Sequence, residues 1–110
     1  MKLTRTLLHT GLLAASLLTI TVATAAGDAE KGKAKANTCM GCHGIGHYTN
    51  AYPSYRVPLL GGQHPEAIVA ALKAYKDGKR NHPTMRAQAI SLSEQDMQDI
   101  AAYLAGTAKQ

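Results

Sequence analysis

The sequence lacks the large aromatic residues that usually dominate a small hydrophobic core. It contains no phenylalanine and no tryptophan, and its 110 residues include only two cysteines. A domain of this size buries a limited fraction of its surface, and small domains often need a disulfide, a metal or another staple. Two cysteines allow one disulfide at most. We therefore expect a group other than side chains to fill part of the core.

The chain also lacks a strong charge of either sign. Two of its 12 basic residues and none of its 7 acidic residues precede residue 26, so the part that follows carries a formal charge of +3. Proteins that bind nucleic acid usually show a denser basic stripe together with aromatic platforms for the bases. Neither pattern is present, and we therefore predict no nucleic-acid partner.

The N-terminal segment has the order of charged, apolar and small residues that is typical of a secretory signal peptide. Residues 1–6 carry Lys2 and Arg5 without any acid. Residues 7–22 are mainly apolar, and residues 23–25 are small. We therefore predict that this segment directs export and is then removed.

Cleavage after Ala25 or Ala26 would remove residues 1–25 as the signal peptide and leave residues 26–110 as a single domain. The alternative is an uncleaved membrane anchor. It is less favoured, because the apolar run falls short of the ~20 residues that a spanning helix needs. Hydroxyl side chains dilute the run further.

Capping residues mark the beginnings of two predicted helices. Asp28 is a suitable N-cap for a first helix that runs through residues 31–36. Ser93 and Asp96 form a capping-box pattern before a last helix, which Gly106 ends. Apolar residues recur in this last helix with helical spacing and predict a buried stripe of Met97, Ile100, Ala101 and Leu104.

A further helix is predicted to begin at Pro65, which suits the first helical position, and to end before Gly78, which suits a left-handed cap. Its apolar stripe comprises Ala67, Ile68, Ala71, Leu72 and Tyr75. Residues 44–62 keep no regular period and residues 79–91 are broken by a proline, so we expect loops there. No strand pattern is present. The predicted fold class is all-α, with three helices and long structured loops.

Residues 39–43 form the sequence C-x-x-C-H, which is the pattern of c-type haem attachment. Residues three apart on a helix lie on the same face, about 5–6 Å apart at Cβ. The sulfurs of Cys39 and Cys42 can therefore reach the two vinyl groups on one edge of a porphyrin and form thioethers. His43 follows directly and is placed to bind the iron from the proximal side.

Three other interpretations of the motif are less favoured. A thioredoxin-like redox pair would need a βαβ context, and no strand pattern precedes Cys39. A structural zinc site needs four ligands, but the candidates Cys39, Cys42, His43 and His47 are crowded together and adjacent residues can hardly converge on one ion. A disulfide between the two cysteines would close too short a loop to stabilise the fold much.

A six-coordinate iron needs a second axial ligand, for which Met85 is the favoured candidate. It stands two residues after Pro83, which stiffens the loop and biases His82 towards an extended conformation. His82 itself is the alternative ligand. The other candidates lie beside the attachment motif, in an apolar stripe or at a helix start: Met40, His47, Met97 and His64. With both His43 and Met85 bound, the iron has no open site for catalysis.

Taken in order, these residues resemble the class I cytochromes c, and most closely the small bacterial monohaem type similar to cytochromes c4, c5 and c553. The likeness covers essentially all of residues 26–110. The matching positions are 27–28, Gly32, 39–44, 57–63, 74–78, Met85, 92–97 and 102–104. Two features depart from the family pattern: Ala36 stands where an aromatic residue is often found, and the tyrosine-rich residues 45–56 have no obvious template.

The resemblance implies the class I cytochrome c fold around one covalent haem c, with roles that spacing alone does not give. Pro58 matches the proline whose carbonyl accepts a hydrogen bond from the proximal histidine, a contact that fixes the tautomer and tunes the metal. Leu60 would lie on the haem. Gly32 matches the small residue at which the first and last helices cross, near Tyr103.

The expected function is single-electron transfer in the periplasm rather than enzymatic catalysis. An oxidase, a reductase or a periplasmic dehydrogenase would be the redox partner, and membranes would be contacted only through such partner complexes. Five basic residues around the segment that presents Met85 could steer partners with acidic docking surfaces: Lys73, Lys76, Lys79, Arg80 and Arg86. A solvated basic face without a partner explains these five residues equally well.

Two other functions stay open on the sequence alone. The protein could be a fixed haem subunit of a periplasmic dehydrogenase or oxidase complex instead of a diffusing carrier. A haem enzyme or sensor with an open iron site is the less favoured alternative, because it would require that Met85 does not bind the iron.

Overall fold

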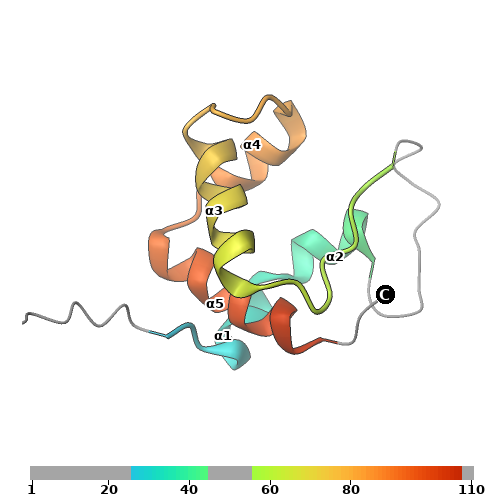
Figure 1. Ribbon diagram of the computed structural model, residues 1–110, viewed down its shortest axis with the longest axis vertical. Helices are drawn as coiled ribbons and strands as arrows, with labels where there is room; N and C mark the ends of the chain where they lie inside the picture. Colours follow the sequence, from blue (N-terminus) through green and yellow to red (C-terminus); the bar gives the residue numbers. More distant parts are fainter. Residues whose placement is uncertain (1–25, 45–55, 108–110) are drawn as a thin grey trace, which may run out of the picture.

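The computed structural model describes residues 26–44 and 56–107, and this part of the chain contains five α-helices and no β-strand (Figure 1). The helices are α1 (Ala29–Lys35), α2 (Asn37–His43), α3 (Pro65–Lys76), α4 (Pro83–Ala89) and α5 (Glu94–Gly106). The predicted all-α class is therefore confirmed. The predicted signal peptide and most of the tyrosine-rich segment lie outside the described residues. None of the described helices is long and apolar enough to cross a membrane.

The predicted N-cap of the first helix is confirmed. The Asp28 carboxylate accepts hydrogen bonds from the backbone N–H groups of Glu30 and Lys31 and so caps α1. The predicted first helix is in fact two helices, because the chain turns at Ala36, which ends α1 and begins α2. Ala36 is fully buried at this turn, so the position that often holds an aromatic residue in the family is a close-packed corner.

The prediction of an unbroken loop over residues 79–91 is wrong, because α4 lies within it. Pro83 occupies the first helical position, where its missing N–H costs no hydrogen bond and its fixed φ suits the helix. His82 precedes it in an extended conformation, as expected, and its ring nitrogen accepts from the Met85 backbone N–H. The proline therefore starts a short helix instead of breaking the chain.

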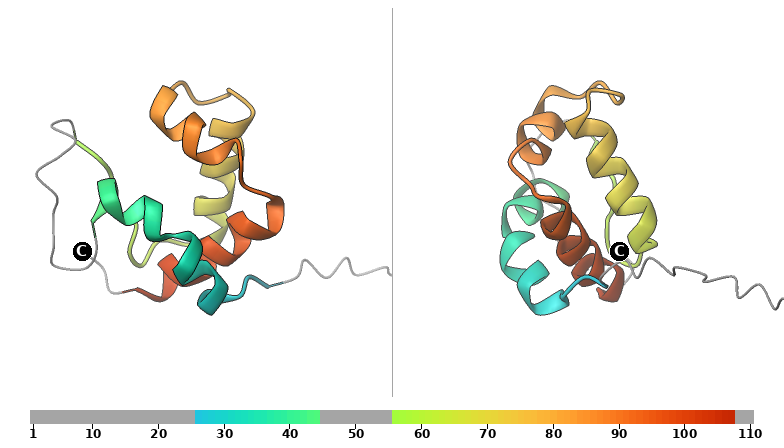
Figure 2. Two further views of the ribbon diagram at one scale, coloured as in Figure 1. Left: turned by 180° about the vertical axis from the view of Figure 1, so that it is seen from behind. Right: turned by 90° about the vertical axis from the view of Figure 1, so that its left-hand side faces the viewer.

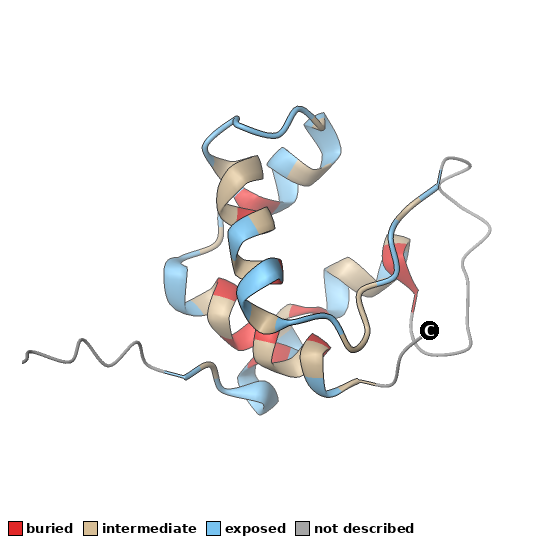
Figure 3. Cartoon of the chain, viewed as in Figure 1, coloured by how far each residue is buried: buried red, intermediate tan, exposed pale blue. Residues whose placement is uncertain are grey.

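Helix α5 supplies half of the buried core (Figure 3). The buried apolar residues are Ala36, Ile68, Leu72, Ala89, Met97, Ile100, Ala101 and Leu104. The last four form the stripe predicted for α5, and each large one stabilises the fold by about 1.5–3 kcal/mol through burial. The predicted stripe of α3 is narrower than expected, since Ile68 and Leu72 are buried but Ala67 is exposed.

Helices α1 and α5 pack directly against each other and hold the two ends of the described chain together (Figure 2). Gly32 lies at this contact: a Cβ there would stand 1.9 Å from the carbonyl oxygen of Asp99 and 3.0 Å from the Tyr103 Cβ. Only glycine permits so close an approach. The predicted packing role of Gly32 is therefore confirmed.

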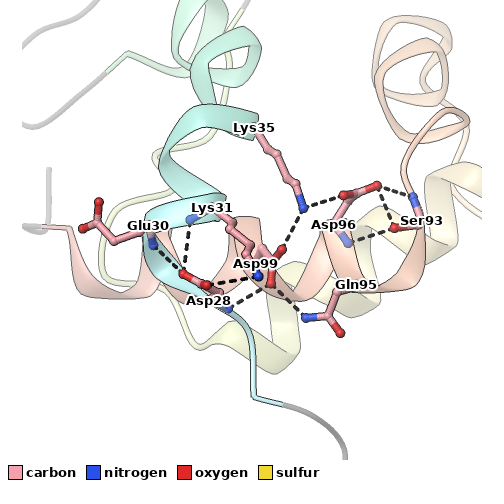
Figure 4. Close-up of polar contacts among 8 residues, drawn as sticks. All are labelled: Asp28, Glu30, Lys31, Lys35, Ser93, Gln95, Asp96 and Asp99. Carbon is pink, nitrogen blue, oxygen red and sulfur yellow. Dashed lines mark hydrogen bonds and ion pairs between the residues drawn. The ribbon is translucent and has the colours of Figure 1, made fainter.

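A buried carboxylate fastens the same contact (Figure 4). The Asp99 side chain is 1% exposed and accepts from the Asp28 backbone N–H at 2.9 Å, from Lys35 Nζ at 2.7 Å and from Gln95 Nε2 at 2.9 Å. Lys35 Nζ also lies 2.6 Å from a carboxylate oxygen of Asp96. The Lys35 ammonium, followed by the Asp28 amide and Gln95, lowers the pKa of Asp99 to about 2. The charged carboxylate thus belongs to the native state.

The N-terminus of α5 carries a complete capping box. Ser93 Oγ accepts from the Asp96 backbone N–H at 3.1 Å, and an Asp96 carboxylate oxygen accepts from the Ser93 N–H at 2.8 Å. The side-chain hydrogen bond with Lys35, followed by those with Ser93, lowers the pKa of Asp96 well below its usual range. One residue therefore caps α5 and also holds α1.

Candidate haem-binding site

A cavity of about 330 Å³ lies between α2, α3, α4, α5 and the segment that begins at Arg56. Protein interiors are close-packed and leave few voids larger than a water molecule, so a space of this size marks a binding site for a large group. All six residues that the sequence singled out line it: Cys39, Cys42, His43, Pro58, Leu60 and Met85. The fold therefore brings the predicted site together.

The two thiols stand on α2, three residues apart, and both are half-buried. They are not bonded to each other. Burial raises the pKa of the Cys39 thiol, whereas a catalytic dithiol pair needs a thiol whose pKa is lowered. Cys39 therefore differs from the reactive thiol of a thioredoxin-like redox pair, and both thiols line the cavity.

His43 ends α2 and is 8% exposed. Its Nδ1 lies 2.7 Å from the carbonyl oxygen of Pro58, the contact that the family resemblance implies. A carbonyl oxygen can only accept, so Nδ1 carries the proton and donates it. Nε2 is then the unprotonated nitrogen, which is the form that binds a metal. The chain can leave the helix sharply here because Gly44 follows with φ of 71°.

The Pro58 segment is anchored to the core on its C-terminal side. Leu60 is half-buried and packs on the buried cluster, while Leu59 is 47% exposed. Farther along, the Gly62 backbone N–H donates to the carbonyl oxygen of Leu104 at 3.0 Å, in the last turns of α5. The carbonyl that orients His43 is therefore held by α5.

Met85 reaches the cavity from α4, at the third residue of that helix. It is half-buried and packs against the hydrophobic core. Of the other methionines in the described part, Met97 is 1% exposed in the core and Met40 packs against it, and neither lines the cavity. Met85 is thus the methionine placed to act as a ligand there.

His82 is the histidine besides His43 that lines the cavity within the described residues. Its Nδ1 accepts from the Met85 N–H at 3.4 Å, so this nitrogen is engaged with the backbone of α4. His64 is exposed and does not line the cavity, and His47 lies outside the described residues. The geometry therefore favours Met85 over His82.

The donor groups and the walls fit a haem. His43 and Met85 both line the cavity. They come from α2 and α4, which do not pack on each other (Figure 2). Apolar side chains line much of the space between them, including Ile68, Leu72, Ile100 and Leu104. Within residues 26–44 and 56–107, no three His, Cys, Asp or Glu side chains gather in a way that could hold a bare metal ion.

Comparison with known proteins decides the family. The family model described as Cytochrome c matches residues 29–108. The chain belongs to the cytochrome c family. Cytochrome c-554(548) of Halomonas halodenitrificans is 43% identical over 81 residues, covering 71% of this chain and 94% of that protein. Cytochrome c4 of Pseudomonas aeruginosa is 41% identical over 97 residues, covering 86% of this chain and 47% of that protein.

Solved structures agree with this assignment. The structure of Acidithiobacillus ferrooxidans cytochrome c4 superposes with a TM-score of 0.60 at 30% identity, covering 74% of this chain and 52% of that one. The chain thus spans about half the length of the cytochrome c4 relatives it matches. It is a class I c-type cytochrome of the c4 type, its cofactor is covalently bound haem c, and one haem is consistent with its size.

Sequence reasoning missed the arrangement that surrounds Met85. The Arg80 guanidinium carbon lies 4.5 Å from the centroid of the Tyr75 ring, and the His82 ring meets Tyr75 edge-on at 6.3 Å between centroids. All three side chains line the cavity. The available signal in the sequence was that an aromatic, a basic and an imidazole residue lie within eight positions of one another.

The predicted basic cluster is partly neutralised by its neighbours. Lys73 pairs with Glu94, and Lys79 lies 3.5 Å from an Asp77 carboxylate oxygen. Lys76 Nζ donates to the carbonyl oxygen of Leu92. Two of the five charges expected to steer partners, those of Lys73 and Lys79, are therefore paired with acids within the domain.

Proposed function

We propose that the chain carries single electrons on one haem c, which is attached through thioethers to Cys39 and Cys42 and ligated by His43 and Met85. The observation that carries this proposal is the His43–Pro58 hydrogen bond at 2.7 Å, which leaves Nε2 unprotonated in a cavity that also receives the Met85 thioether. When bound, haem iron alternates between the ferric and ferrous states and so accepts or gives up one electron.

The residues of the chain keep this change of oxidation state free of large rearrangement. The Pro58 carbonyl holds His43 in one tautomer and one orientation. Leu60 and the apolar walls of the cavity limit the access of water, which tunes the reduction potential. With His43 and Met85 both holding the iron, no open site would be left for a substrate. This favours electron transfer over catalysis or gas binding.

The periplasm is the proposed location. The N-terminal pattern supports export with cleavage after Ala25 or Ala26 and a domain over residues 26–110. We propose that the partners are redox proteins with acidic docking surfaces, although the basic residues near Met85 that are engaged with Glu94 and Asp77 weaken this attraction.

A fixed haem subunit is the second candidate function. It is favoured by one relative, the cytochrome subunit of sulfide dehydrogenase from Chlorobaculum tepidum, which is 30% identical over 80 residues and is covered to 69% of its length. Gel filtration of a native extract separates the two. A carrier elutes at the size of a small protein, whereas a subunit elutes with its complex.

The test of the main proposal is a visible spectrum of the protein exported from cells that have a working haem-ligation apparatus. We expect absorption of low-spin haem that stays with the polypeptide after extraction with acidified acetone, together with the weak long-wavelength band of methionine-ligated ferric haem. Met85→Ala should abolish that band and let imidazole bind to the ferric iron. A colourless product, or a wild-type protein without the band, would overturn the proposal.

A further inference from the structure

Two helices of this protein begin with the same dipeptide and differ in what the histidine does. His64-Pro65 precedes α3, and His82-Pro83 precedes α4. The side chain of His64 makes no cap hydrogen bond and is exposed. The ring of His82 is half-buried and its Nδ1 accepts from the Met85 N–H at 3.4 Å. Of these two His-Pro pairs, the one whose histidine caps its helix is therefore the one before Met85.

Neighbouring side chains hold the His82 ring in this orientation. Tyr75, on the last turn of α3, presents its ring to His82 at an interplanar angle of 77°. The Arg80 guanidinium covers the Tyr75 ring, and the Arg80 backbone N–H donates to the Ala74 carbonyl oxygen at 3.0 Å. The 3.4 Å hydrogen bond is long and weak by itself. It therefore relies on the packing of Tyr75 against the His82 ring.

Helix α4 depends on such contacts because it is short. It has seven residues, and an isolated helix of that length is not stable in water. Its far end is fixed by Ala89, which is fully buried, and its first turn by the Arg86 N–H to His82 carbonyl bond at 2.9 Å. Met85 is the third residue of the helix. The backbone N–H at this position is one from which an N-cap side chain normally accepts a hydrogen bond.

We propose that His82 is the positioning residue for Met85. Its Nδ1 fixes the Met85 backbone so that the thioether stays directed into the cavity, a role that rests on the proposed ligation of iron by Met85. His82 acts through the backbone and does not bind the iron itself. The packing of Tyr75 against the imidazole, reinforced by Arg80, keeps the ring available as the cap.

The experiment compares imidazole binding to the ferric holoproteins of the wild type, His82→Ala and His82→Asn. Imidazole competes with Met85, so its apparent Kd falls when the Met85 bond opens more often. We expect the Kd of His82→Ala to fall about twofold, the lower end of the range for an N-cap because this hydrogen bond is long, and its long-wavelength band to weaken. Asparagine is also a good N-cap, so His82→Asn should bind imidazole like the wild type.

Two control variants separate positioning from general loss of stability. His64→Ala removes the histidine of the other His-Pro pair, and Ser93→Ala removes the cap of α5. Both should leave the imidazole Kd unchanged. If His82→Ala cannot be purified, Tyr75→Leu tests the same point by removing the ring that orients His82, and Tyr75→Phe, which keeps the ring, should match the wild type.

The outcomes are distinguishable. A wild-type protein that lacks the methionine band and binds imidazole as readily as Met85→Ala contradicts the proposed ligation itself. A wild-type protein with the band, but an unchanged Kd in His82→Ala, overturns the positioning role alone. So does a His82→Asn protein that behaves like His82→Ala, because the hydrogen bond would then not be the cause.

Discussion

The carbonyl oxygen of Asp99 lies 1.9 Å from the point where a Cβ on Gly32 would stand. A backbone atom cannot move aside as a flexible side chain can, so a methyl group here forces α1 and α5 apart. The hydrogen bonds from the Asp28 amide and from Lys35 to Asp99 join the same two helices, so they would lengthen as the helices move apart.

Gly32→Ala should therefore lower the free energy of unfolding by about 3 kcal/mol, the upper part of the range for overpacked sites. Gly106→Ala is the matched control, since a Cβ there meets nothing within 4 Å. Thermal unfolding of the two holoproteins checks the prediction. A Gly32→Ala protein as stable as Gly106→Ala would show that the helices can separate without loss.

Asp99 should make the stability of the fold dependent on acid pH. Its pKa is lowered to about 2 by Lys35, Asp28 and Gln95, below the ~3.9 of an exposed aspartate in the unfolded chain. The native state therefore binds this proton less readily, and the stabilisation is complete above about pH 4 and lost as the pH falls towards 2.

Asp99→Asn isolates this contribution from the effects of acid on other groups. The variant should be less stable than the wild type at pH 7, and the difference should shrink as the pH is lowered from 4 to 2. Urea unfolding at several pH values measures it. A difference that stays constant over this range would mean that the charge of Asp99 does not stabilise the fold.

Leu104 and Leu59 allow a comparison of equal deletions at buried and exposed sites. Leu104 is 2% exposed in the core and Leu59 is 47% exposed. Leu104→Ala should cost about 2–5 kcal/mol of unfolding free energy, whereas Leu59→Ala should cost less than about 1 kcal/mol. Denaturant titration of both variants checks the contrast, and similar losses would contradict the placement of the core.

Without haem the protein should be largely unfolded. The buried apolar set is small, contains no aromatic residue and faces a cavity of about 330 Å³. Cys39→Ala combined with Cys42→Ala prevents covalent attachment and should leave little ordered helix by circular dichroism. Helicity close to that of the wild type would show that side chains alone can complete the core.

Local sequence signals predicted the parts of the fold that depend on neighbouring residues. The Asp28 cap, the Ser93–Asp96 capping box and the α5 stripe are each defined within a few positions, and all are present. Helix α4 was missed because Pro83 was read as breaking the chain, when it begins a helix.

The ring of contacts around Asp99 could not be predicted from spacing. Lys35 and Asp99 lie 64 residues apart, and only the packing of α1 on α5 brings them together. Asp99 is next to the α5 stripe in the sequence, but nothing in the spacing indicates its partner. The cavity residues were identified because the attachment motif and the family pattern both constrain them, while the Tyr75–His82 contact depends on how α3 and α4 pack.

The hydrogen bond from the Asp28 amide to Asp99 joins positions 71 residues apart. Ribosomal synthesis proceeds from the N-terminus, so α2 and its two thiols leave the ribosome long before α5 exists. Closing so long a loop carries an entropic cost that only the finished chain can offset. The cavity that Cys39 and Cys42 line is completed by Ile100 and Leu104 of α5, the helix made last. Both sulfurs therefore pass through a stage of biogenesis in which that wall of the cavity does not yet exist.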